Sequence, residues 1–316
     1  MNNSSAGSVR TRASCYSRWL PSPTPVGTSG RKPAAQPLWK LLLELTPEQV
    51  AATLDLSYLE DVLTHEQAVE LLKNPISTRA SREGILASGY PGYDTSVGWL
   101  NYSDDQVREN CKRAMDAGFT AMKLKVGSKD PERDLRRARI VREVAGPDAC
   151  IMVDANQQWT LPQALDICAR LKEINPFWIE EPTHPDIIGH MALAYAIAPV
   201  KLALGGHVPN RIIFKNYLQV ECAGFIQVDA VRVAGVSEFL AVSIMCKKFG
   251  VPVVPHVGDM GQLHQHLVTF NHIGLDLPVV FLEHIPHLRE HFVNPVRVED
   301  GVYRIPQDIG SSCDLL

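Results

Sequence analysis

Two lysines, Lys123 and Lys125, stand two positions apart in a short apolar stretch of the chain. Alternate side chains of a β-strand share a face, so both ammonium groups would point to one side and Met122 and Leu124 to the other. Adjacent ammonium groups repel each other, so we expect carboxylates nearby and a lowered pKa for both lysines. Such a lysine can remove a proton as a general base. Taken alone, the motif fits two surface lysines with solvated charges equally well.

Other polar residues follow apolar runs at nearly even intervals. With Gly206 counted as one step, successive members of the series stand 23 to 27 residues apart. The polar members are Asp154, Glu180, Asp229, His256 and Glu283. A single residue of this kind is more often structural than catalytic, but the recurrence favours a ring of polar groups around one rim of the fold.

The residue types in this ring suggest one kind of chemistry. Asp154 and Glu180 offer the hard oxygen ligands that suit Mg²⁺. Lys125 would face the space above the metal from one side and His256 from the other. Asp229 could orient His256 and support its protonated form. A base, an acid and Mg²⁺ together indicate removal of a proton next to a carboxylate.

The elements that must position these residues form a repeating pattern. Short apolar runs alternate with amphipathic helices, which is typical of βαβ units and a parallel sheet. The runs are 90–96, 121–126, 150–154, 177–180, 201–204, 225–229, 251–255 and 279–283. Eight such units closing on themselves predict a (β/α)8-type barrel, whose active site lies at the carboxyl ends of the strands.

The two ends of the chain differ from this repeat. Residues 1–36 are rich in Ser, Pro and Gly, contain four arginines and have no acidic residue. We predict a disordered tail there, and an organelle transit peptide is the alternative. Residues 37–87 read as a helical lead-in, 88–292 as the barrel and 293–316 as a C-terminal remnant.

Composition excludes several classes of protein. The net charge of -4 gives no basic patch for a nucleic acid. No apolar run approaches the roughly 20 residues that a membrane helix needs. Seven scattered cysteines without a CxxC pair indicate a reduced, intracellular protein, cytoplasmic or mitochondrial, and no zinc site.

Several longer motifs carry a family resemblance. They are Tyr90–Ser96, Met122–Gly127, Val153–Gln157, Trp178–Thr183, Asn210–Lys215 and His287–Phe292. Together they resemble the mandelate racemase/muconate lactonizing branch of the enolase superfamily, and within it the L-fuconate dehydratases, over roughly residues 33–308. The resemblance implies a (β/α)7β TIM-like barrel and Mg²⁺-dependent dehydration of a small acid sugar to a 2-keto-3-deoxy acid. A galactonate dehydratase or a racemase would share this chemistry.

The resemblance also implies a role for each residue of the ring. Lys125 would be the base, with Lys123 beside it, and His256 paired with Asp229 would be the acid that expels the β-hydroxyl. Asp154 and Glu180 would bind Mg²⁺. The remaining substrate contacts would come from Lys123, Glu283 and Asn156.

Three departures from the family pattern bear on activity. Gly206 stands where the family has the glutamate that is the third metal ligand, and His207 beside it does not replace that glutamate. Most of the family's N-terminal α+β capping domain would be missing, leaving the rim open to water. The loop after His256 is shorter, and Asp259 within it is an alternative but disfavoured replacement for the missing carboxylate. An impaired dehydratase and an inactive, truncated variant that acts through binding are both compatible with these departures. Uncovered apolar surface would favour a homo-oligomer.

Overall fold

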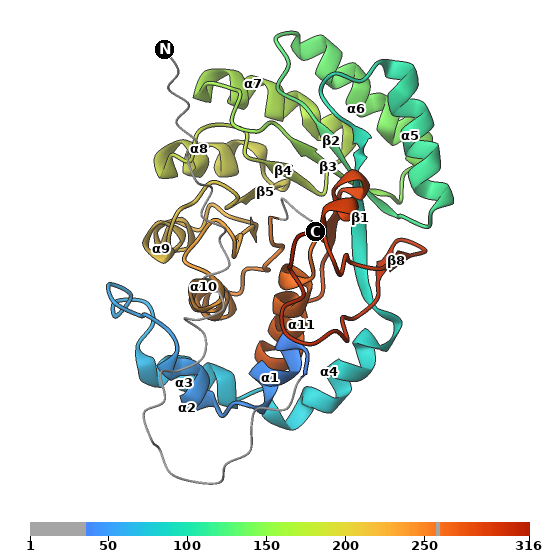
Figure 1. Ribbon diagram of the computed structural model, residues 1–316. Coiled ribbons are helices and arrows are strands. Elements are labelled where there is room, and N and C mark those ends of the chain that lie inside the picture. Colours follow the sequence, from blue (N-terminus) through green and yellow to red (C-terminus); the bar gives the residue numbers. More distant parts are fainter. Residues whose placement is uncertain (1–35, 257–259) are drawn as a thin grey trace, which may run out of the picture. The chain divides into compact units, whose positions relative to one another are not determined.

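The computed structural model describes residues 36–256 and 260–316, so the predicted tail lies, apart from Gln36, outside the described residues. Within them, parallel strands lie inside a layer of helices (Figure 1). The parallel strands are β1 (Tyr90–Gly98), β2 (Ala121–Lys125), β3 (Cys150–Asp154), β4 (Trp178–Glu180), β5 (Lys201–Leu204), β6 (Phe225–Ile226) and β7 (Leu282–His284). They follow the order β6-β5-β4-β3-β2-β1, with β7 on the other side of β1.

The run predicted at residues 251–255 also belongs to this sheet. It contributes one parallel bridge, between Val253 and Ile226 of β6. All eight predicted runs therefore contribute to the same parallel arrangement, in sequence order. The predicted α/β barrel architecture is confirmed.

The strands alternate between two apolar environments. Met122 and Leu124 face outward and pack in the layer between strands and helices. Inward-facing residues from successive strands fill the centre: Tyr93, Ala121, Met152, Trp178, Ala203, Phe225 and Val254. Lys123 and Lys125 share the face of Ala121, so they point inward as predicted.

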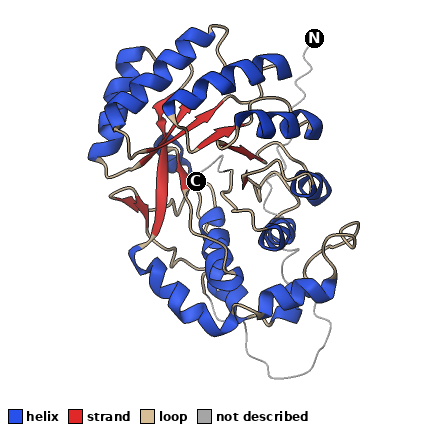
Figure 2. Ribbon diagram, turned by 180° about the vertical axis from the view of Figure 1, so that it is seen from behind, coloured by secondary structure: helices blue, strands red, loops and turns tan. Residues whose placement is uncertain are grey.

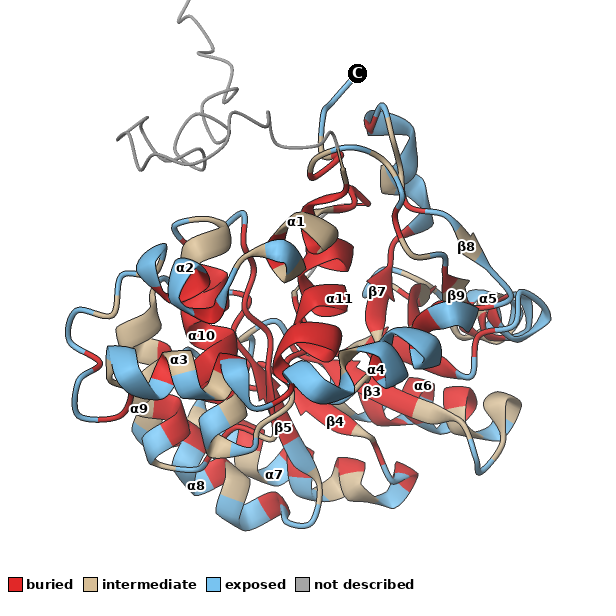
Figure 3. Cartoon of the chain, turned by 90° about the horizontal axis from the view of Figure 1, so that it is seen from below, coloured by how far each residue is buried: buried red, intermediate tan, exposed pale blue. Residues whose placement is uncertain are grey.

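The outer helices begin at residues that cap them. Ser103 and Gln106 form a capping box ahead of α5, and the side chain of Asp130 accepts from two backbone N–H groups of α6. These helices are α5 (Asp104–Asp116), α6 (Pro131–Ala145), α7 (Leu161–Leu171), α8 (Ile187–Ile197), α9 (Arg211–Gln219), α10 (Val236–Phe249) and α11 (Leu263–Leu275). Figure 3 shows α11 buried along its length, whereas α7 and α8 expose their outer faces.

Both terminal segments pack on the barrel. The lead-in forms α1 (Leu38–Glu44), α2 (Pro47–Ala52), α3 (His65–Lys73) and α4 (Arg79–Ile85), and α1 and α4 pack on α11. At the other end, β8 (Val298–Glu299) and β9 (Val302–Tyr303) form a hairpin whose second strand pairs antiparallel with β1 (Figure 2). The division at residues 37–87, 88–292 and 293–316 stays a proposal. No helix within the described ranges is both long and apolar enough to cross a membrane.

Candidate active site

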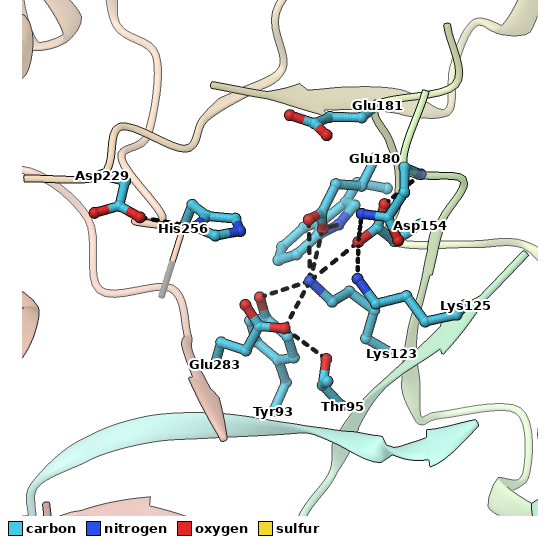
Figure 4. Close-up of polar contacts among 12 residues, drawn as sticks. Tyr93, Thr95, Lys123, Lys125, Asp154, Glu180, Glu181, Asp229, His256 and Glu283 are labelled. Carbon is cyan, nitrogen blue, oxygen red and sulfur yellow. Dashed lines mark hydrogen bonds and ion pairs between the residues drawn. The ribbon is translucent and has the colours of Figure 1, made fainter. Parts of the chain in front are cut away.

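The predicted ring residues lie at the carboxyl ends of the strands. Lys125, Asp154 and Glu180 are the last residues of β2, β3 and β4, and the strand register aligns them side by side. Glu283 lies on β7, and Figure 4 shows it facing the same space. His256 reaches that space from the opposite side to Lys125. The structure thus brings a lysine, a histidine and three carboxylates to one rim.

Lys123 occupies the centre of this cluster. Its Nζ lies 3.0 and 3.1 Å from the two carboxylate oxygens of Glu180, 2.8 Å from Glu283 Oε1 and 3.6 Å from Asp154 Oδ2. Burial alone would lower its pKa, but the carboxylates of Glu180 and Glu283 raise the pKa of Lys123 well above its usual value. The prediction of a lowered pKa is wrong for Lys123, because the carboxylates around it outweigh the effect of burial.

The carboxylates are held by further polar groups. The Trp178 indole donates to Glu180 Oε2 over 3.1 Å, and the Thr95 hydroxyl donates to Glu283 Oε1 over 2.7 Å. Burial and the charge of Asp154 raise the pKa of Glu180 to about 8. Burial would also raise the pKa of Asp154, but Lys125 and Lys123 lower it below its usual value. Of these two carboxyl groups, Glu180 is the one with the raised pKa, so a cation bound beside it would change its ionisation more than that of Asp154.

Lys125 lies closer to solvent than Lys123 and contacts Asp154 directly. Its Nζ also lies 5.6 Å from the centre of the Trp99 ring. Beneath it, the fully buried Arg137 of α6 donates to the carbonyls of Lys125 over 2.9 Å and Trp99 over 2.6 Å. Arg137 thereby fixes the strand end that carries the proposed base. Asn156, the remaining predicted contact, lies beside Asp154, whose Oδ1 accepts from the Asn156 backbone N–H over 2.8 Å.

His256 pairs with Asp229, as the sequence suggested. Its Nδ1 lies 2.9 Å from Asp229 Oδ2, which leaves Nε2 as the ring nitrogen available to a substrate. A second imidazole touches the other oxygen, since His264 Nε2 lies 3.1 Å from Asp229 Oδ1. Sequence reasoning missed His264, because it follows His256 by a loop that carries no spacing rule.

Gly206, which begins the turn after β5, lies directly against His256. A Cβ atom built at this position would lie 2.7 Å from His256 Cδ2 and 3.3 Å from Glu181 Oε1. The neighbouring His207 is turned toward Glu181, with its Nδ1 2.8 Å from Oε2. A hollow of about 310 Å³ borders Gly206, and Arg232 lines its other wall. Asp259, the other suggested replacement for the missing ligand, lies outside the described residues.

The donor set fits Mg²⁺ only as a two-carboxylate site. Asp154 and Glu180 are buried oxygen donors at neighbouring strand ends. Burial, together with the negative charge of Asp154, raises the pKa of Glu180, and a bound cation would oppose both effects. In residues 36–256 and 260–316, no three His, Cys, Asp or Glu side chains are grouped to hold a metal ion. At the position where the family resemblance implies a third ligand, Gly206 has no side chain to offer.

The fold is a parallel α/β barrel, and a lysine, a histidine and three carboxylates lie together at one rim of it. This combination of fold and site is the basis for assigning the protein to a class. The chain belongs to the enolase C-terminal domain-like family, whose model matches residues 106–315. The resemblance to the mandelate racemase/muconate lactonizing branch of the enolase superfamily is confirmed.

Named relatives agree with this assignment. Mitochondrial enolase superfamily member 1 of Bos taurus is 41% identical over 292 residues, covering 90% of this chain and 66% of that protein. L-galactonate dehydratase of Hypocrea jecorina is 38% identical over 289 residues, covering 89% and 64%. The chain thus spans just under two thirds of the length of these relatives.

Solved structures show the same relationship. The crystal structure of human mitochondrial enolase superfamily member 1 matches with a TM-score of 0.84 and 39% identity, covering 89% of this chain and 65% of that one. L-talarate dehydratase from Polaromonas sp. JS666, complexed with Mg and L-glucarate, matches with a TM-score of 0.66 and 28% identity, covering 80% and 71%.

Proposed function

We propose that this protein is a Mg²⁺-dependent sugar-acid dehydratase. The observation that carries the proposal is the placement of Lys125 and His256 on opposite sides of one buried carboxylate cluster (Figure 4). A base and an acid facing each other across a small space suit removal of a proton and of a hydroxyl from adjacent carbons. The dehydratase names of the L-galactonate and L-talarate relatives support the same reaction class.

The proposed reaction assigns one proton transfer to each of these residues. Lys125, once its Nζ has given up a proton, takes the proton from the carbon next to the substrate carboxylate. His256 donates a proton from Nε2 to the β-hydroxyl, which leaves as water. The remaining enol becomes a 2-keto-3-deoxy acid when it takes up a proton at carbon 3. Substrate and products balance as one acid sugar giving one keto acid and one water.

The other cluster residues would hold charge and orientation. Asp229 would keep the His256 ring turned so that Nε2 faces the substrate, and Glu283 and Lys123 would contact the substrate carboxylate. Asn156 would border the substrate beside Asp154. Asp154 and Glu180 would hold Mg²⁺, which when bound would supply positive charge to the substrate carboxylate as the α-proton leaves.

The substrate is proposed at two levels. The broader level is a small acid sugar, and the finer one is L-fuconate, with L-galactonate as the alternative because of the Hypocrea jecorina relative. The test is release of 2-keto-3-deoxy acid from L-fuconate, L-galactonate and galactarate, with Mg²⁺ and with a chelator. Turnover of L-fuconate alone supports the finer proposal, turnover of another sugar acid replaces it, and silence on all three overturns both.

An inactive protein that acts through binding is the second candidate. Gly206 favours it, because the third-ligand position is empty of a side chain and His256 lies against it. Mg²⁺ titration separates the two candidates: a dehydratase binds Mg²⁺ and turns over, whereas the inactive variant holds a sugar acid without releasing product. The mitochondrial location in the relatives' name supports the same compartment for this chain, again as a proposal.

A further inference from the structure

Asp229 is shared between two imidazoles. Its Oδ2 lies 2.9 Å from His256 Nδ1, and its Oδ1 lies 3.1 Å from His264 Nε2. The backbone N–H of Val231 also donates to Oδ1 over 2.8 Å. His264 is 1% exposed and lies in the first turn of α11, so a buried side chain from a separate element fixes the second oxygen of this carboxylate.

His264 Nε2 has two neighbours, the Ala230 N–H and Asp229 Oδ1, and it cannot form a hydrogen bond with both of them in one protonation state. The backbone N–H of Ala230 points at this nitrogen from 3.0 Å, which requires a lone pair there. Asp229 Oδ1, at 3.1 Å, requires a proton on the same nitrogen. A buried carboxylate favours the protonated partner, since charge-assisted hydrogen bonds are stronger than neutral ones.

Other charged groups face this pair from neighbouring elements. Arg232 Nε lies 3.5 Å from Asp229 Oδ2, on the His256 side of the carboxylate. The ring of His207 lies 6.5 Å from that of His256, and the Glu283 carboxylate faces His256 across the site. His264 is the group that contacts Oδ1 from α11, so its proton affects how much negative charge remains for His256.

We propose that His264 is a positioning residue that pins Asp229 and draws part of its charge away from His256. A His256 imidazolium with less support from Asp229 releases its proton more readily. In the dehydration, which rests on the proposed function, this makes His256 a stronger acid toward the leaving hydroxyl. The geometric part of the proposal, a shared carboxylate, stands independently of turnover.

The experiment is a titration of the histidine side chains by NMR with ¹³Cε1-labelled histidine. His256→Gln assigns the His256 signal. In His264→Leu the pKa of His256 should rise by roughly one unit, because Asp229 then serves one imidazole. In His264→Gln, whose amide still donates to Oδ1, the rise should be smaller. An unchanged His256 pKa in folded His264→Leu overturns the proposal.

A matched control separates this effect from the loss of any buried histidine. His266 lies two residues further along α11 and is fully buried, and among the described residues neither of its ring nitrogens has a hydrogen-bond partner. His266→Leu should leave the His256 pKa where it is in the unchanged chain. A shift of the same size as in His264→Leu would assign the effect to the packing of α11 and overturn the proposal.

A reciprocal measurement covers the case in which His264→Leu fails to fold. In His256→Ala, which leaves no donor at this position, the pKa of His264 should rise, since the competition for Asp229 is relieved from the other side. No rise overturns the proposal. If the protein also turns over a sugar acid, the alkaline limb of the pH–rate profile should move upward in His264→Gln. Absence of any turnover would count against the proposed function and leave the NMR result as the test of the shared carboxylate.

Discussion

The two sides of the candidate site are built differently. On the lysine side, formed by β2, β3 and β4, the strands run in continuous register and their charged ends pair with one another. The histidine side, from β5 to Val253, has much less strand pairing. There β6 has only two residues, and the run at 251–255 pairs with it through the single bridge between Val253 and Ile226. There His256 is positioned by side-chain contacts, with Asp229 on one edge and Gly206 against its ring.

This contrast predicts different sensitivities. On the lysine side, backbone pairing between β2, β3 and β4 fixes the positions of the charged side chains. Substitutions that change side-chain charge should therefore matter more there than substitutions that change side-chain volume. The histidine side depends on close contacts between side chains, so a single added carbon should be enough to disturb it. The predictions below test this distinction, from the largest expected effect to the smallest.

Removing the ammonium group of Lys125 should have the largest effect. Lys125→Met keeps the unbranched stem of the side chain but removes the proposed base, so turnover of the sugar acid should fall by roughly 10³-fold or more. Exchange of the substrate's α-proton with deuterated solvent should fall in parallel. The exposed Lys129 provides the matched control, and Lys129→Met should keep full activity. Substantial α-proton exchange in Lys125→Met would remove the lysine side from the chemistry.

The support beneath the lysine side should affect stability next most strongly. Arg137→Met leaves the carbonyls of Lys125 and Trp99 without their buried donor, at a cost of about 3 kcal/mol in the free energy of unfolding. Urea unfolding measures this change. Arg139 pairs with Glu173 at an exposed position, so Arg139→Met should change the same quantity by less than about 0.5 kcal/mol. Equal effects of the two substitutions would mean that Arg137 contributes no more than a surface arginine.

A single added carbon should disturb the histidine side. Gly206→Ala places a Cβ 2.7 Å from His256 Cδ2, so the ring must move away from its contact with Asp229. We expect a loss of turnover of roughly 10²-fold, the effect of misplacing a catalytic group by about 1 Å, and a changed His256 NMR signal. Gly84 has no heavy atom within 4 Å of the same construction, so Gly84→Ala should leave both unchanged.

The glutamate that the family would place here sharpens the comparison. Considered only as a metal ligand, the glutamate in Gly206→Glu would add a third carboxylate to the site and strengthen Mg²⁺-dependent turnover. The contact with His256 predicts the opposite, because the new side chain needs the space that the ring fills. A gain of Mg²⁺-dependent turnover in Gly206→Glu would show that the His256 ring gives way at little cost, and the two sides would then differ less than their contacts indicate.

Sequence predicted the lysine side better than the histidine side for a physical reason. Alternation along a strand and the spacing of βα repeats are local properties, so Lys123, Lys125, Asp154 and Glu180 could be placed on one rim from periodicity. The direction of the Lys123 pKa could not be predicted, since it depends on how many carboxylates from other strands surround it. Local patterns predict which groups meet but not the balance of charge among them.

On the histidine side, the informative contacts join residues that are distant in sequence. Gly206 was identified as the missing ligand, yet its contact with His256 depends on the meeting of two loops. His264 reaches Asp229 from a helix that follows a loop of irregular length. Neither periodicity nor motif spacing describes such contacts, so sequence analysis found the pair His256–Asp229 and missed its third member.

The smallest effect concerns His266, which shares α11 with His264. Burial lowers the pKa of His266 to about 4, and neither ring nitrogen has a hydrogen-bond partner among the described residues. The unfolded chain, with a histidine pKa of about 6.5, takes up a proton that the folded protein resists. Stability that is fully present above pH 6.5 is therefore lost as the pH falls toward 4, by about 2 kcal/mol at pH 4.5.

His266→Leu should remove this part of the acid sensitivity. Its free energy of unfolding, measured by urea at pH 7 and pH 4.5, should fall by about 2 kcal/mol less between the two values than that of the unchanged chain. His65→Gln, at an exposed position in α3, is the control for loss of a histidine. If His266→Leu kept the whole acid sensitivity, His266 would have to be solvated in the folded protein. The histidine side depends on side chains packed around α11. That packing would then be looser than the burial of the α11 residues indicates.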